Sequence, residues 1–232
     1  MGNAWDATFG SITLNTQGAV DVIVEADNGI AIGGGKASEK SEINVLSGTV
    51  RLETACGHSI SIGCVEDSVP IYISDVLMNL EIKSDKGIGI GCGGIDQDSE
   101  IRKVKMNITA AGTTVACIGN VGEISGFIRI GDCEVNAVAN GQHVFLVGGN
   151  SGDVSVFMKK AAINIRGEGN EVLGVGTMDN GATINSEEVG LDIKISAGKP
   201  ITLGTRENLD LFEKCIKSTD VNDRRSQRVN KE

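Results

Sequence analysis

The stretch Asp85-Lys86-Gly87-Ile88-Gly89-Ile90-Gly91-Cys92 alternates glycine with isoleucine, and six further copies of this element recur along the 232-residue chain. The copies close on Gly33, Gly63, Gly91, Gly119, Gly148, Gly176 and Gly204. Successive closing glycines lie 30, 28, 28, 29, 28 and 28 residues apart. A fixed period of this length is typical of architectures in which each repeat packs only on its neighbours. The spacing therefore predicts one elongated domain over residues 1–205.

The residues before each closing glycine test whether the repeats stack in register. Thirteen and eleven residues back, all positions are apolar: Val20, Val22, Val50, Leu52, Met78, Leu80, Met106, Ile108, Val135, Ala137, Ile163, Ile165, Leu191 and Ile193. Twelve residues back, all positions are polar: Asp21, Arg51, Asn79, Asn107, Asn136, Asn164 and Asp192. Because side chains alternate between the faces of a strand, the apolar set should face the interior and the polar set the solvent.

Two more aliphatic series precede the glycines. The near series, one residue back, is Ile32, Ile62, Ile90, Ile118, Val147, Val175 and Leu203. The far series, three residues back, is Ile30, Ile60, Ile88, Ala116, Phe145, Leu173 and Ile201. We expect both to form stacked ladders in the interior, as in the preceding strand. These series, together with short β-branched segments that end at Gly, Asn or Asp, predict an all-β fold. We expect a right-handed parallel β-helix of about seven coils, each of about 28 residues with three short strands.

The repeat stops after Gly204. Residues 206–217 have an amphipathic pattern, with Leu209, Phe212 and Ile216 on one face, and they predict a C-terminal capping helix. Residues 218–232 lack recurring apolar positions, which favours a disordered tail or a linker. The polar loops between coils vary in length, so the edge that they form is a candidate binding surface.

Composition narrows the function. Aromatic residues make up 3% of the chain, few for a function built on stacking, and the net charge of −10 disfavours binding to nucleic acid or anionic lipid. No run of apolar residues is long enough to span a bilayer, so we expect no membrane insertion. The sequence also shows no export signal with a basic and an apolar region, so we expect either a cytoplasmic chain or a fragment of a larger surface protein. The six cysteines lack metal-ligand spacing, which favours free buried thiols over zinc. Cys64 and Cys92 occupy equivalent positions on consecutive coils, so a disulfide between them is the alternative.

Three motifs offer chemistry, each beside a simpler interpretation. Residues 89–94 satisfy the dinucleotide fingerprint G-x-G-x-x-G, but no helix is expected after them, and the repeat explains the glycines. Asp96, Gln97, Asp98 and Glu100 match no complete calcium loop and are interpreted as a solvated acidic loop. Glu53 and Glu81 on adjacent coils could form the carboxylate pair of a polysaccharide hydrolase or lyase, although alternating charge is common on exposed strands. We expect no catalysis, cofactor or metal.

Aligned amides give the strongest site hypothesis. Asn79, Asn107, Asn136 and Asn164 should lie one above another on an outer face. Identical amides at strand spacing can hydrogen-bond along the stack and lock its register, and this structural role is favoured over ligand binding. We nevertheless take these four residues as the candidate ligand-binding site. His58 and His143, the only histidines, lie on nonadjacent coils and suggest no catalytic triad.

The repeated G-I-x-I-G-x-G element, clearest in residues 29–35 and 87–91, resembles the Gly-rich β-helical repeat domains of bacterial, notably clostridial-type, surface proteins. The resemblance covers residues 6–205 and implies a β-helix that is often associated with carbohydrate binding. We therefore expect a non-catalytic interaction or spacer module, which binds a protein partner or associates with itself through an exposed β-face or loop edge. A carbohydrate-binding module is the alternative, and a β-helical polysaccharide lyase or hydrolase is third.

Overall fold

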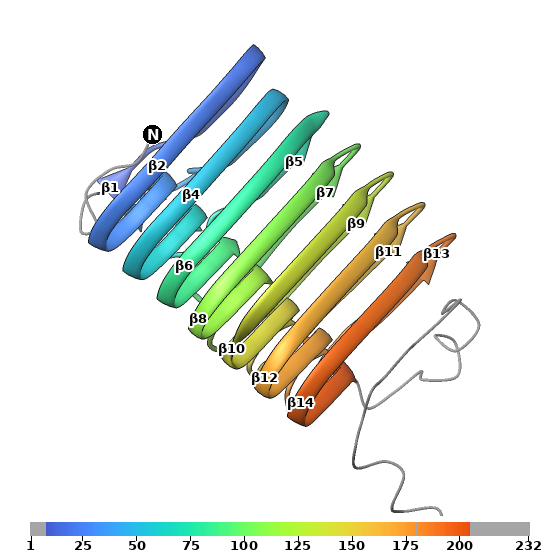
Figure 1. The fold of residues 1–232 in the computed structure, drawn as a ribbon. Coiled ribbons are helices and arrows are strands. Elements are labelled where there is room, and N and C mark those ends of the chain that lie inside the picture. The colour runs from blue at the N-terminus through green and yellow to red at the C-terminus, as the bar shows by residue number, and fades with distance from the viewer. Residues whose placement is uncertain (1–7, 180, 205–232) are drawn as a thin grey trace, which may run out of the picture.

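The computed structural model describes residues 8–179 and 181–204, which form a parallel β-solenoid of about seven turns (Figure 1). The predicted capping helix and tail, 206–217 and 218–232, lie outside the described residues. Within the described ranges no helix is long and apolar enough to cross a membrane.

Short and long strands alternate along most of the chain. The strands are β1 Thr8–Phe9, β2 Ile12–Gly34, β3 Lys36–Ala37, β4 Ile43–Cys64, β5 Ile71–Ser74, β6 Val76–Ile90, β7 Asp96–Arg102, β8 Lys105–Gly119, β9 Ser125–Gly131, β10 Glu134–Gly149, β11 Val154–Lys159, β12 Ala162–Thr177, β13 Thr183–Glu187 and β14 Gly190–Gly204. Every pairing between them is parallel, and long strands pair with long ones in the order β2, β4, β6, β8, β10, β12, β14. β7, predicted as a loop up to residue 100, is a strand from Asp96.

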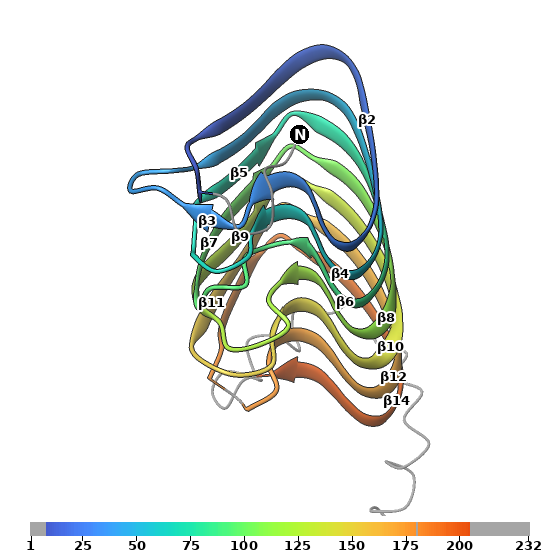
Figure 2. The same ribbon diagram turned by 90° about the vertical axis from the view of Figure 1, so that its left-hand side faces the viewer.

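Each coil has three sides but, in its regular part, only two strands. The short strands β5, β7, β9, β11 and β13, with the first residues of β2 and β4, make the side that we call the first sheet. The long strands from β6 onward bend once, so that the first part of each lies in a second sheet and the last part in a third, and β2 and β4 continue into the same two sheets (Figure 2). The predicted second and third strands are thus one continuous element, because the ladder pairing resumes directly after the bend.

The second sheet confirms the predicted register. The apolar positions of its inner face, from Val50 to Ile193, are 3% exposed or less, and only Val20 and Val22 at the N-terminal end are half-buried. The polar positions between them lie on the outer face. Seven stacked coils therefore share one continuous aliphatic core, as a solenoid requires because each coil alone has too little apolar area to bury.

The third sheet differs from the prediction. The near series joins the main core, but the far series forms two separate clusters beneath Val65, Val121 and Met178 of the loops. In β6 the inner positions beside the far series are glycines, Gly87 and Gly89, and a Cβ added to Gly87 would lie 2.5 Å from Ile82 Cγ2 in the core. The prediction that both series line one interior is therefore wrong for the far series. Its aliphatic side chains lie on the opposite face, where the loops bury them.

The corner between the first and second sheets is built from charged residues in the left-handed region. Asp75, Lys103, Asp132, Lys160 and Glu188 have φ between 49° and 56°. The backbone N–H of each of the first four donates to a carbonyl of the next coil at 2.9 to 3.2 Å. Their charges alternate along the stack, and Lys103 Nζ lies 3.9 Å from Asp75 Oδ1. This alternation offsets part of the cost of a left-handed conformation in residues other than glycine.

The corner after the third sheet requires glycine. Gly148 has φ 127°, and an added Cβ would collide with the carbonyl oxygen of Gly176 on the next coil. The closing glycines that reveal the repeat in the sequence are therefore required by a close approach of consecutive backbones.

Candidate functional site

The asparagine ladder forms as predicted on the outer face of the second sheet. Asn107 Nδ2 donates to Asn79 Oδ1 at 3.0 Å, Asn136 Nδ2 to Asn107 Oδ1 at 3.2 Å, and Asn164 Nδ2 to Asn136 Oδ1 at 3.0 Å. The register brings all four residues onto neighbouring coils at equivalent positions. Each of the three bonds thus runs from a donor amide to the amide of the preceding coil, and only Asn107 and Asn136 both donate and accept within the ladder.

The ladder leaves limited capacity for a ligand. A neutral amide has two N–H groups and two acceptor sites on oxygen, and the inner ladder residues use one of each on their neighbours. At the C-terminal end the next outer residue is Asp192, whose Oδ1 is buried without a hydrogen-bond partner among the described residues. The ladder geometry therefore supports a register-locking role and leaves one polar edge for contacts with a partner.

Glu53 and Glu81, the candidate carboxylate pair, are neighbours in the sheet register. Lys83 Nζ lies 3.3 Å from Glu53 Oε1 and 2.6 Å from Glu81 Oε1, and Arg51 lies 3.4 Å from Glu53. The hydrogen bond and positive charge of Lys83 lower the pKa of Glu81. A general acid needs a raised pKa, so the shift of Glu81 is opposite to that role.

The acidic residues near 96–100 do not form an acidic loop. Gln97 is fully buried and accepts from the Cys92 N–H at 3.0 Å, so it braces the preceding corner. Asp96 Oδ1 accepts from the Ser125 hydroxyl. Within the described part of the chain, no group of three or more His, Cys, Asp or Glu residues could hold a metal ion. The glycines of 89–94 lead into β7, a strand, so the helix that a dinucleotide site needs is missing there.

The described cysteines are free and buried, so Cys64 and Cys92 form no disulfide. Burial raises the pKa of Cys92 and of Cys117 to about 12. At the start of the third sheet, His143 Nδ1 lies 2.9 Å from Glu171 Oε2 and Lys199 Nζ lies 2.7 Å from Glu171 Oε1. These two contacts lower the pKa of Glu171, and they join the row across three strands through one hydrogen bond and one ion pair.

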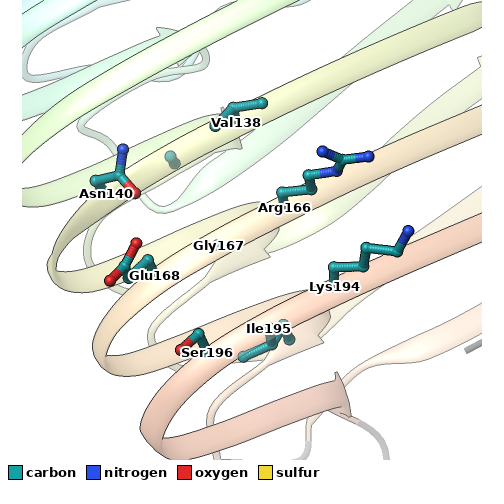
Figure 3. A pocket seen from close by; sticks show the side chains of 9 residues that line it. Val138, Asn140, Arg166, Gly167, Glu168, Lys194, Ile195 and Ser196 are labelled. Carbon is teal, nitrogen blue, oxygen red and sulfur yellow. The ribbon is translucent and has the colours of Figure 1, made fainter. Parts of the chain in front are cut away.

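A shallow hollow of about 450 Å³ lies beside the C-terminal half of the ladder. Two outer rows border it, Val138, Arg166 and Lys194 on one side and Asn140, Glu168 and Ser196 on the other (Figure 3). Lys194 pairs with Asp192 at 3.5 Å, whereas the Arg166 guanidinium has no partner among the described residues. The hollow combines cations, a carboxylate, an amide and a hydroxyl, a set that can hydrogen-bond a polar small molecule.

A second exposed surface lies on the first sheet and was missed by the sequence analysis. The aromatic patch consists of Tyr72, Phe127, Arg129 and Phe157 on the outer side of β5, β9 and β11. The Arg129 guanidinium carbon lies 3.7 Å from the ring centroid of Phe127 and 5.6 Å from that of Phe157. Tyr72 and Phe157 are each 37% exposed. The chain therefore places three of its few aromatic residues on one outer face.

A local signal could have located this patch. Phe127 and Arg129 alternate with the buried Ile128 and Ile130, as Phe157 does with Val156 and Met158. That alternation assigns the aromatic residues to the solvent side. They do not recur at one position of the repeat, so a search for conserved rows passes over them.

Comparisons with family models, with curated proteins and with solved structures found no match to this chain.

Proposed function

We propose that this chain is a non-catalytic β-solenoid interaction or spacer module that binds a protein partner, or a second copy of itself, through the first sheet. The observation that carries the proposal is the aromatic patch. Aromatic residues and arginine are enriched at the centres of protein interfaces, where they contribute most of the binding energy. A flat sheet with a preformed cation–π stack presents these groups with little conformational entropy left to lose.

The second sheet offers a useful contrast. Its outer amides and charges bond to one another, in the asparagine ladder and in the ion pairs around Lys83. The rings of Tyr72 and Phe157, by comparison, keep more than a third of their surface exposed. Covering exposed aromatic area is favourable, whereas covering paired polar groups gains little. This difference supports the first sheet as the main contact surface.

Two finer expectations belong to the same proposal. The right-handed winding follows from the strong preference of parallel crossover connections. The relationship to Gly-rich β-helical domains of bacterial surface proteins, and with it a bacterial module, is supported by the G-I-x-I-G-x-G element at residues 29–35 and 87–91.

Carbohydrate binding is the alternative function, and the hollow beside the asparagine ladder favours it. Sugar hydroxyls need several donors and acceptors held in fixed positions, and Arg166, Glu168 and Ser196 supply these on two adjacent coils. The C-terminal end of the ladder at Asn164 continues this polar surface.

Site-specific photo-crosslinking tests the first-sheet proposal. A benzophenone amino acid is placed at Tyr72 or Phe157 in the patch and, as matched controls, at Leu77 or Ile23, exposed apolar residues of the second sheet. We expect defined adducts, with a protein partner or with the chain itself, from the two patch positions only. Equal adduct yields from all four positions would contradict a specific first-sheet surface.

A glycan array separates the alternative. The wild type is compared with Arg166→Ala/Lys194→Ala and with Asn107→Ala/Asn136→Ala, and with Arg129→Ala as the patch control. Specific glycan binding that only the first two variants lose would support a carbohydrate module at the hollow and ladder. Binding that persists in both would rule that surface out.

A further inference from the structure

Six consecutive outward residues of the first sheet, one from each of six coils, form a row that reads almost the same from both ends. We call these six the central row: Asn44, Tyr72, Glu100, Arg129, Phe157 and Asn185. Thr13, which pairs with Asn44 from the N-terminal side, lies outside this run. In chemical class the row runs amide, aromatic, acid, base, aromatic, amide. Reversing the row exchanges the acid with the base and leaves the other classes unchanged. A reversed copy is therefore complementary to the original.

A two-fold axis performs this reversal. If the axis lies between two first sheets, parallel to the strands and midway between β7 and β9, it brings the sheets face to face with the solenoids antiparallel. Glu100 then faces Arg129 of the second copy, and Tyr72 faces its Phe157. The two terminal amides, Asn44 and Asn185, meet in the same way. Such an isologous contact closes on itself, so it yields a dimer rather than a fibre.

The neighbouring rows are compatible with the same axis. Two residues before the central row, Asp98 faces Phe127 of the second copy. Two residues after it, the exposed Arg102 faces Gly131, which leaves room for a long side chain, and Ser74 faces Lys159. In none of the facing pairs named here do two like charges meet. β7 carries three outward acids, Asp96, Asp98 and Glu100, and one base, and β9 carries the single base Arg129, so the facing strands attract.

We infer that two copies of this chain associate through their first sheets about this two-fold axis, an inference that rests on the proposed interaction function and names the partner. Six coils at about 4.8 Å and strands of five to six residues give roughly 500 Å² per copy, or about 1,000 Å² in total. That area lies at the lower limit of specific interfaces, so the dimer is weak and depends on concentration.

Charge reversal tests the inference with two variants that complement each other. In Glu100→Arg two bases face two bases across the axis, and in Arg129→Glu two acids face two acids. We expect either change to raise the dimer dissociation constant at least about tenfold. In an equimolar mixture of the two variants each base faces an acid again, and the heterodimer should recover. Sedimentation velocity from micromolar to millimolar concentration measures all three samples, with circular dichroism to confirm that each variant is folded.

The exposed Glu25 of the second sheet supplies a matched control, since Glu25→Arg makes the same charge change away from the contact and should dimerise as the wild type does. A wild type that stays monomeric over the whole range overturns the inference, as do single variants that dimerise normally or folded variants whose mixture does not recover. The proposed function can survive these failures. If the chain is monomeric but still crosslinks another protein from Tyr72 and Phe157, the first sheet remains an interaction surface, and only the inference that a second copy binds there is wrong.

Discussion

The bend between the second and third sheets is filled in opposite ways on two adjacent coils. In β6 the large side chain is Ile82, before the bend, and the residue across from it is Gly87. In β8 the equivalent positions are Ala110 and Val115, so the large side chain comes after the bend. β12 follows β8, with Gly167 before the bend and Val172 after it, and a Cβ on Gly167 would collide with Val172.

The coils of β2, β6, β8, β10 and β12 thus keep one roughly constant volume that either of two positions, five residues apart, can fill. Neither position looks uniform when its row is read alone: the first row mixes glycine, alanine, threonine, valine and isoleucine, and the second row mixes glycine, serine, valine and proline. The packing requirement belongs to the pair. Interiors are close-packed, so a second large side chain at the same bend has no room, and two small ones leave a cavity.

Exchanging the two solutions should have the largest effect. Gly87→Val puts a side chain where a Cβ already lies 2.5 Å from Ile82 Cγ2, and we expect a loss of about 2–3 kcal/mol in the free energy of unfolding. Ile82→Ala alone should cost about 2–5 kcal/mol, because it leaves a cavity. The double variant copies the Ala110 and Val115 arrangement and should be more stable than either single variant. Urea unfolding of the four proteins measures this coupling.

The same exchange in a coil that is already in the other state provides the control. Ala110→Ile/Val115→Gly converts the β8 bend to the β6 arrangement and should also be better tolerated than Ala110→Ile alone. Additive losses in both coils would mean that the two positions do not share one space.

Coil β8 also differs from β6 in the next inner position of the third sheet, Cys117 in place of Gly89. Burial raises the pKa of the Cys117 thiol to about 12, above the value of about 9 in the unfolded chain. Below pH 9 the thiol is protonated in both states and its contribution to stability is fully present. Between pH 9 and pH 12 the thiol ionises only in the unfolded chain, so the free energy of unfolding falls by about 1.4 kcal/mol for each pH unit. Urea unfolding between pH 8 and pH 10 should show a shallower decline in Cys117→Ala than in the wild type. Equal declines would show that the Cys117 thiol has the same pKa in the folded and the unfolded chain.

In β4 polar side chains fill the bend. Substituting two buried serines there by alanine should change the stability of the fold in opposite directions. Ser59 Oγ accepts from Thr54 Oγ1 at 3.2 Å and lies 2.6 Å from Ser84 Oγ, whereas Ser61 Oγ has no partner among the described residues. Ser61→Ala removes an unsatisfied hydroxyl and should gain about 1 kcal/mol. Ser59→Ala leaves its partners unpaired and should lose about 1–2 kcal/mol. Thermal unfolding distinguishes the two variants. A loss of stability in Ser61→Ala would contradict the absence of a hydrogen-bond partner for the Ser61 hydroxyl among the described residues.

The second sheet was predictable from the sequence because each of its rows has one chemical character along the solenoid. The polar row is flanked by two apolar rows, and only one register of the strands places both apolar rows in the interior along the whole solenoid. Met78, Asn79 and Leu80 occupy the positions that this register assigns to them. The closing glycines were predictable for a related reason, since no other residue fits the approach of two backbones at Gly148.

The third sheet and the aromatic patch were not predictable in this way. The inner positions Gly87 and Gly89 have no side chain, so the hydrophobic pattern of that strand marks the face that the loops cover rather than the core. In the first sheet the residues of a row differ from coil to coil, and the proposed complementarity between two copies depends on their order, such as Glu100 beside Arg129. It does not depend on one residue type that repeats along the row. Row-by-row conservation cannot detect either arrangement.

The asparagine ladder should show the smallest effect, because its bonds compete with water. Asn107→Ala removes two interamide bonds from the middle of the ladder, and Asn79→Ala removes one from its end. We expect losses of about 1 kcal/mol and about half that value, respectively, in urea unfolding. Asn107→Ala/Asn136→Ala should cost less than the sum of its single variants, because the two residues share one bond and the first substitution already breaks it. If Asn107→Ala cost no more than Asn79→Ala, the amides would act independently, and their alignment would then favour a ligand rather than the register of the coils.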